Sequence, residues 1–206
     1  DIKNIATISA RSEEIGKVIA EATDKIGKEG KIDVQESEVN GIRVEYAPGL
    51  EIDEGYIAEF MMNNERGEAV LKNPYILLVD SKLSNIKDVL PIMQKVVDAG
   101  ANEILLVCDG LEGNMLPTIA LNKRAKYLEG KNVMEVIAVK FPAIRKEEFI
   151  EDIALVTQCK VMGMKTGLFP DKAVITDLGR CEKVVITNKK TVFIGGKGNV
   201  EEKIAT

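Results

Sequence analysis

Three short, almost uninterrupted apolar runs constrain the fold of this chain most strongly. They cover residues 75–80 (YILLVD), 103–108 (EILLVC) and 133–139 (VMEVIAV). Strands that are buried on both faces have this composition, and they belong to parallel sheets that helices cover. Amphipathic helical patterns alternate with the runs, at 86–97, 115–120 and 149–154. This order predicts an α/β fold with right-handed crossovers.

Two prolines bear on where the first two of these helices begin. Pro91 and Pro117 fall inside the patterns, and proline is tolerated in a first helical turn but costs about 3 kcal/mol deeper in. We therefore expect the helices to begin near Val89 and near Met115 and to run side by side. Their apolar content exceeds what one buried face needs, which predicts a water-facing groove lined in part by Leu90, Met93, Leu116, Ala120 and Leu121.

The same argument extends to a segment that has weak strand or helix character. This segment is rich in large apolar residues: Tyr56, Phe60, Met61 and Met62. The alternative is that all of these residues, and those of the two helices, belong to the core. Methionine favours a binding surface, because it repacks easily against different partners.

Shorter patterns flank the central region. Residues 12–30 predict a helix, and 31–36 and 42–46 predict two half-buried strands, followed by a domain boundary at Pro48-Gly49. Near the other end, 183–187 and 191–194 predict a hairpin, and the tail predicts the first turns of a further helix. Because the chain starts at Asp1 inside a patterned segment, we interpret it as a piece of a longer protein.

Composition excludes several classes of function. The chain has no histidine, so neither a Ser-His-Asp triad nor a His-ligated metal site exists. A net charge of −5 and 4% aromatic residues do not favour nucleic-acid binding. No apolar run approaches the ~20 residues of a membrane span. The widely spaced cysteines, Cys108, Cys159 and Cys181, fit a reducing cytoplasm.

Enzyme chemistry remains as an alternative. Asp80, Asp109 and Glu112 lie at or just beyond strand ends, where α/β sheets place their sites, so a metal- or nucleotide-dependent enzyme is one hypothesis. Ser84 begins a Ser-x-x-Lys pattern, but it is also expected to cap a helix. The glycine-rich residues 195–198 match neither standard phosphate-loop pattern.

Longer motifs resemble one family in a single register. Residues 49–56 (GLEIDEGY) resemble the start of the apical domain of GroEL-type group I chaperonins, G-M-x-F/I-D-x-G-Y. Residues 73–86 (NPYILLVDSKLSNI) with Leu90-Pro91 resemble the family's S-P-F-I-L-L-A-D-K-K-I-S-N-I-R and the L-P that follows it. The resemblance continues through 111–122, 151–154, 177–179 and 184–186, and residues 7–10 and 16–22 resemble the intermediate domain.

The resemblance implies a molecular chaperone. The expected fold is an apical-domain-like mixed or parallel sheet flanked by helices (48–206, truncated at its C-terminal helices), after a smaller α+β part of the intermediate domain (1–47). In this family the apical domain captures non-native polypeptides and the mobile loop of a GroES-type co-chaperonin in an apolar groove between two helices. Carried over to this sequence, the binding residues are Tyr56, Phe60, Met61, Leu90, Met93, Leu116, Ala120 and Leu121.

The resemblance also implies what this piece lacks. It has no catalytic, cofactor or metal site of its own, whereas the parent is an ATP-hydrolysing ring of identical subunits in the cytoplasm, with ATP and Mg bound elsewhere. No nucleic-acid or membrane partner is expected. The chain departs from the family at 139–145, in an apparent insertion at 124–131, and at Glu54, Gln94, Asn114 and Ala120. These departures affect the salt bridges between subunits and domains.

Overall fold

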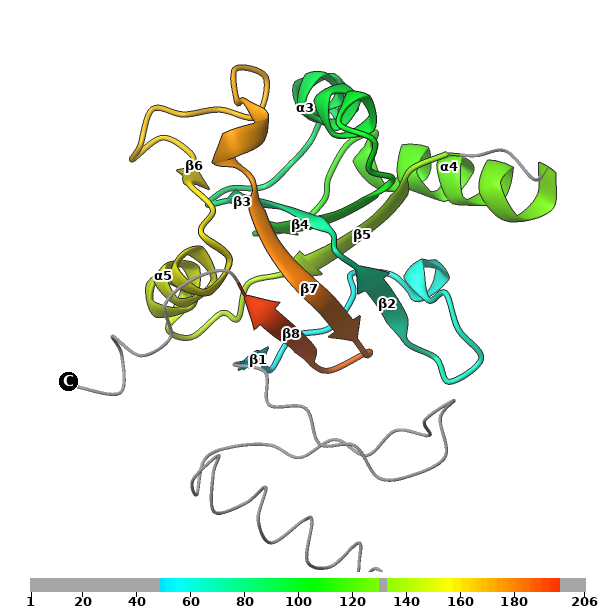
Figure 1. Cartoon of the computed structure of the whole chain (residues 1–206), viewed down its shortest axis with the longest axis horizontal. Helices are drawn as coiled ribbons and strands as arrows, with labels where there is room; N and C mark the ends of the chain where they lie inside the picture. The colour runs from blue at the N-terminus through cyan, green and yellow to red at the C-terminus, as the bar shows by residue number, and fades with distance from the viewer. Residues whose placement is uncertain (1–48, 130–132, 197–206) are drawn as a thin grey trace, which may run out of the picture. The chain divides into compact units, whose positions relative to one another are not determined.

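The computed structural model describes residues 49–129 and 133–196, which lie within the unit Pro48–Thr206 (Figure 1). The predictions for 1–47 and for the C-terminal tail lie outside the described residues. Within the described residues the fold is mixed α/β, with an eight-stranded sheet and three α-helices. The predicted alternation is confirmed as β3 (Tyr75–Val79), α3 (Ile86–Asp98), β4 (Glu103–Cys108), α4 (Met115–Glu129), β5 (Glu135–Lys140) and α5 (Lys146–Thr157).

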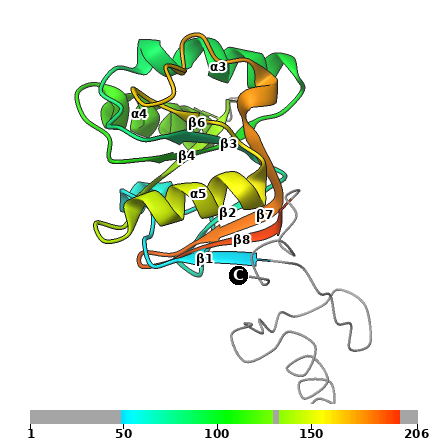
Figure 2. The same ribbon diagram turned by 90° about the vertical axis from the view of Figure 1, so that its left-hand side faces the viewer.

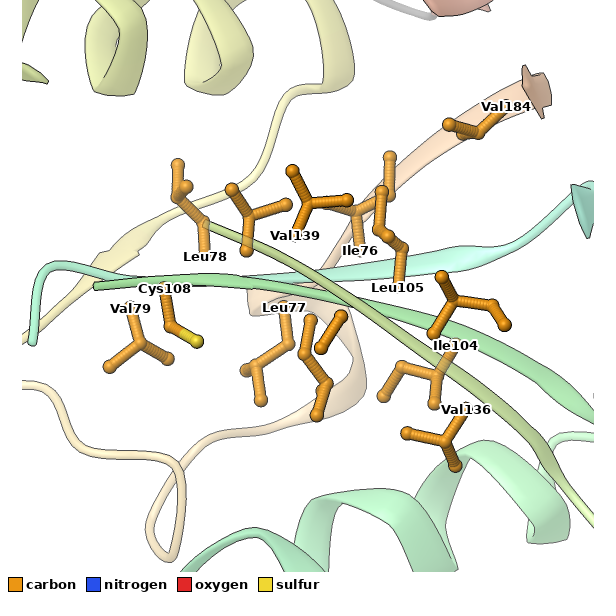
Figure 3. Packing of buried hydrophobic residues seen from close by; sticks show 14 of the residues in the cluster. Ile76, Leu77, Leu78, Val79, Ile104, Leu105, Cys108, Val136, Val139 and Val184 are labelled. Atoms are coloured by element: carbon orange, nitrogen blue, oxygen red, sulfur yellow. The ribbon is translucent and has the colours of Figure 1, made fainter. Parts of the chain in front are cut away.

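The three predicted apolar strands form a parallel array in the order β3-β4-β5, and the short β6 (Val161–Met162) pairs with β3 in parallel. Figure 3 shows side chains leaving these strands toward both faces of the sheet, with Ile76 and Leu105 on one side and Leu77 and Ile104 on the other. All four are completely buried. Burial on both faces explains why the strands read as continuous apolar runs.

Helices cover the two faces of this array unequally. α3 and α4 lie on one face, and α5 lies on the opposite face (Figures 1 and 2). α5 also packs against β7 (Gly179–Ile186) and β1 (Gly49–Ile52). The face under α3 and α4 is therefore the one that carries two helices, but they do not run side by side as predicted: Figure 1 shows α4 lengthwise and α3 nearly along its axis, and Figure 2 shows the reverse.

The antiparallel part of the sheet consists of β1, β8 (Thr191–Gly196), β7 and β2 (Ala69–Lys72). β7 joins it to the parallel array, because its first residues pair with β3. The predicted hairpin around Asn188 is confirmed, with Ile186 opposite Thr191. Two single-turn 3-10 helices, η1 (Glu59–Met61) and η2 (Ile175–Asp177), complete the described elements.

The predicted late start of the first helix is wrong. α3 begins at Ile86, and its N-cap is Asn85, not Ser84, because the Asn85 side chain accepts a hydrogen bond from the Lys87 amide. Pro91 therefore lies beyond the first turn, where burial of the core face of α3 outweighs the lost hydrogen bond. α4 begins at Met115 as predicted, so Pro117 occupies its first turn.

Replacing Pro91 by alanine should stabilise the protein. Pro91→Ala restores a main-chain amide that can bond the Lys87 carbonyl. The greater entropy of the unfolded chain offsets part of this gain. The free energy of unfolding, measured by urea denaturation, should therefore rise by about 1–2 kcal/mol. Pro117→Ala is the matched control and should change stability little, because a first-turn amide has no partner within the helix. Equal effects of the two variants would contradict this account.

Candidate functional site

The starts of α3 and α4 are tied to each other. The Asn114 side-chain oxygen accepts from the Ile86 amide at 2.9 Å, and the Asn114 amide donates to the Ser84 carbonyl at 3.2 Å. Just before the helices, Leu83 and Leu111 form a parallel bridge. These bonds join the loops that follow two neighbouring strands, so they fix where the two helices begin.

Glycine is required in this junction. Gly113 has a φ of +55°, and a Cβ added to it would fall on the Ser84 carbonyl, far inside van der Waals contact. Gly100, after α3, also has a positive φ of +80°, but open space surrounds it. Substitution at Gly100 therefore tests backbone strain alone, whereas substitution at Gly113 tests backbone strain together with a steric clash.

Gly113→Ala should destabilise the protein by about 2–4 kcal/mol, because it adds a clash to an unfavourable backbone conformation. Gly100→Ala carries only the backbone strain and should cost about 1 kcal/mol. Urea denaturation measures both. Similar losses for the two variants would mean that the contact between the helix starts contributes little.

α3 has more apolar surface than its core face uses. Val89, Ile92 and Val96 are buried. A second stripe follows at spacings of four, three and four residues, made of Ile86, Leu90, Met93 and Val97. Leu90 is 55% exposed and Val97 is 48% exposed, while Ile86 and Met93 are half-buried. The predicted residues Leu90 and Met93 therefore lie on one apolar stripe that reaches the surface.

The predicted residues of α4 lie on two different sides of the helix. Leu116 and Ala120 are one turn apart and half-buried. Leu121 is 66% exposed and lies about 100° further round the helix axis than Ala120. The apparent insertion at 124–131 lies partly in the last turns of α4 and partly outside the described residues.

The predicted residues of the first segment also separate. Tyr56 is half-buried and bridges Val139 at the edge of β5. Phe60 is half-buried, whereas Met61 is completely buried, and its sulfur accepts from the Ala138 amide at 3.4 Å. Met61 thus anchors the segment to the core and does not line the surface.

A shallow hollow lies between this segment and α4. Its volume is about 510 Å³, and it is lined by Phe60, Met62, Asn63, Asn64, Glu65, Ala120, Lys123 and Arg124. Of the eight predicted binding residues, the hollow brings together only Phe60 and Ala120. Leu90, Met93, Leu116 and Leu121 do not line it, so the described residues present an apolar stripe on α3, the exposed Leu121, and a separate hollow beside α4.

An ion cluster that sequence reasoning missed holds the wall of this hollow. Glu135 is only 3% exposed, and its two oxygens accept from Lys123 at 2.8 Å and from Lys126 at 2.5 Å. Lys123 also donates to the Met61 carbonyl at 2.9 Å. Burial by itself would raise the pKa of Glu135, but the two ammonium groups lower it below its ordinary value. The sequence contained one indication of this cluster, because Glu135 is an acidic residue within an otherwise apolar strand.

The low pKa of Glu135 makes this contribution to stability dependent on pH. The pKa of Glu135 is lower in the folded protein than in the unfolded chain. Its carboxylate therefore stabilises the fold fully at pH values above the unfolded pKa, and this stabilisation is lost as the pH falls through the folded pKa. Glu135→Gln should cost about 2–3 kcal/mol at neutral pH, and less as acid protonates the native glutamate. Glu148→Gln removes an exposed ion pair and should change urea denaturation little. A pH-independent loss for Glu135→Gln would contradict the assignment.

The alternative catalytic residues, which follow β3 and β4, are tied to two lysines. Asp109 pairs with Lys146 at 2.6 Å, and Glu112 pairs with Lys82. Lys146 also donates to the main-chain carbonyl of Asp80 at 2.9 Å. Across 49–129 and 133–196 no three His, Cys, Asp or Glu side chains are grouped so that they could hold a metal ion.

Lys165 begins a Lys-Thr-Gly pattern that belongs, with Ser84, to the serine hypothesis. Lys165 pairs with Glu147 at 2.5 Å. The three cysteines are free and buried, and burial raises the pKa of Cys108 and Cys159 to about 11 and that of Cys181 to about 12. Thiols with such high pKa values are poor nucleophiles.

A comparison with models of known protein families finds no match for the chain. In the part of the chain that the structure describes, no helix combines the length and the apolar character that crossing a bilayer requires.

Proposed function

We propose that this chain is the polypeptide-binding part of a group I chaperonin and captures non-native polypeptides on the helix-covered face of its sheet. The observation that carries the proposal is the exposure of two leucines, Leu90 on α3 and Leu121 on α4, on the side of the sheet where these helices lie (Figure 2). The motifs shared with the chaperonin apical domain support it along most of the chain. The apical-domain architecture itself is part of this proposal.

The proposed mechanism is hydrophobic capture. An unfolded client exposes apolar side chains, and the stripe on α3 together with Leu121 removes them from water. A contact of about 300–600 Å² at ~25 cal/mol/Å² gives on the order of 10 kcal/mol gross, and association and ordering costs offset most of it. Each copy should therefore bind weakly and with little sequence preference.

A rigid base keeps these side chains at the surface. The core beneath α3 is already filled by Val89, Ile92 and Val96, so Leu90 has no space to turn inward. The bonds of Asn114 hold the starts of α3 and α4 together. The apolar surface is thus available without a conformational change.

The rest of the proposed role follows from the chaperonin resemblance. In a ring of identical subunits, several such surfaces would raise affinity through effective concentration. A co-chaperonin loop would compete for the same surface and release the client, and ATP with Mg would act on parts of the parent outside this chain. We place this activity in the cytoplasm, which the free, buried cysteines support.

Charging the two exposed leucines should abolish capture without unfolding the protein. Leu90→Glu with Leu121→Glu should weaken binding of an unfolded polypeptide tenfold or more, because each leucine contributes about 1 kcal/mol on burial. The measurement is suppression of aggregation of a chemically unfolded client in the absence of ATP.

Ile144→Glu is the matched control, because Ile144 is 78% exposed and lies in the loop before α5. It introduces the same kind of charge on an apolar residue that is more exposed than Leu90 or Leu121, and it should leave capture intact. Unchanged suppression by the double leucine variant, with circular dichroism like that of the unmodified protein, would refute the proposed function.

A further inference from the structure

One edge of β2 carries main-chain groups that point away from β7, its partner strand (Figure 1). In an antiparallel pair, residues that bond the partner strand alternate with residues whose amide and carbonyl point outward. Both main-chain groups of Val70 bond a side chain instead of β7, so Val70 is an outward residue, and Lys72, two positions on, is outward as well. Such an edge pairs readily with another chain when nothing occupies it.

The Asn63 side chain occupies this edge as a neighbouring strand would. Its nitrogen donates to the Val70 carbonyl and its oxygen accepts from the Val70 amide, each at 2.8 Å. One carboxamide therefore makes both bonds that a paired residue of another strand would make. Further along, the Lys72 amide donates to a Glu103 carboxylate oxygen at 2.5 Å. The outward groups at the middle of β2 are thus satisfied within the chain.

A tight turn over 63–68 places Asn63 beside Val70. The Asn64 side-chain oxygen accepts from the Arg66 amide at 3.0 Å and from the Glu68 amide at 2.9 Å. The Asn63 amide donates to the Glu68 carbonyl at 2.9 Å, which closes the turn. The two neighbouring asparagines therefore have different roles, because Asn64 shapes the turn and Asn63 bonds the edge of the sheet.

The edge of β5 is covered in a different way. The Ile57 amide donates to the Ala138 carbonyl at 2.9 Å, and the Ala138 amide donates to the Met61 sulfur at 3.4 Å. A segment of chain thus lies along β5, whereas a single side chain bonds the middle of β2. Closure of β2 at Val70 depends on Asn63.

The geometry of β2 suits pairing with a second copy of itself. Ala69 and Leu71 are buried, and their pairing with β7 keeps the strand extended whether or not Asn63 is present. In an antiparallel pair, two opposite residues exchange both of their main-chain bonds. Two copies related by a two-fold axis at Val70 would therefore replace the bonds that Asn63 makes, and a two-fold arrangement closes after two chains.

We propose that the Asn63 side chain prevents a second copy of this chain from pairing with β2. Its removal turns the strand into a site of self-association. The inference concerns the edge of the sheet and does not depend on the proposed function, which concerns exposed side chains on α3 and α4. Failure of either one leaves the other standing.

Asn63→Ala in the full chain tests the inference. The average mass in sedimentation equilibrium should rise toward twice that of the unmodified protein as the concentration increases. Under dilute conditions, hydrogen exchange at the Val70 amide should be at least about fivefold faster, because that amide loses its acceptor. A mass like that of the unmodified protein, with faster exchange at Val70, would show that Asn63 only supports the loop and would overturn the inference.

Asn64→Ala is the matched control. It also removes a side chain that accepts main-chain bonds in the same turn, but it leaves both bonds between Asn63 and Val70 in place. The mass of this variant should equal that of the unmodified protein. Association as strong as that of Asn63→Ala would assign the effect to loosening of the turn and would overturn the inference.

A second substitution locates the contact. Val70→Pro, added to Asn63→Ala, removes the outward amide without removing a bond to β7, and proline is tolerated at such a position of an edge strand. Association should be lost in the double variant. Association that persists there would place the contact elsewhere on the molecule and would also overturn the inference.

Discussion

Burial of β3, β4 and β5 on both faces is the constraint on which the rest of the described structure depends. Parallel pairing places the carboxyl ends of β3 and β4 at the same edge of the sheet, so the chain must leave both strands at neighbouring points. The loops that follow meet through Leu83, Leu111 and Asn114. Two helices therefore begin together over one face, and each must cover apolar side chains beneath it.

Covering the sheet does not use all the apolar surface of α3. Its core face is complete with three buried residues, and the next stripe extends to the surface. An exposed leucine by itself needs no explanation, since folded proteins expose much apolar surface. The regular spacing of the stripe and the exposure of Leu121 on α4, the helix that begins beside α3, are what support the proposed binding surface.

Charge has a different role on the other side of α4. The buried Glu135 would destabilise the start of β5 if it were alone, and two lysines from α4 compensate for it. The same lysines bind α4 to the strand, and Lys123 also binds it to the segment that carries Phe60. The hollow is thus built from ionic contacts, whereas the surface on α3 is built from packing.

Sequence by itself determined the three buried strands, the order in which helices alternate with them, and the C-terminal hairpin, because hydrophobic periodicity reports burial directly. It also predicted apolar surface beyond the needs of one helix face at Leu90, Met93, Leu116, Ala120 and Leu121, of which Leu90 and Leu121 are exposed. The tertiary structure alone decided that α3 begins at Ile86, because the packing of Val89, Ile92 and Val96 outweighs the cost of Pro91. It alone buried Met61, paired Lys123 and Lys126 with Glu135, and formed the hollow. These contacts join residues far apart along the chain, and local patterns carry no information about which of them meet.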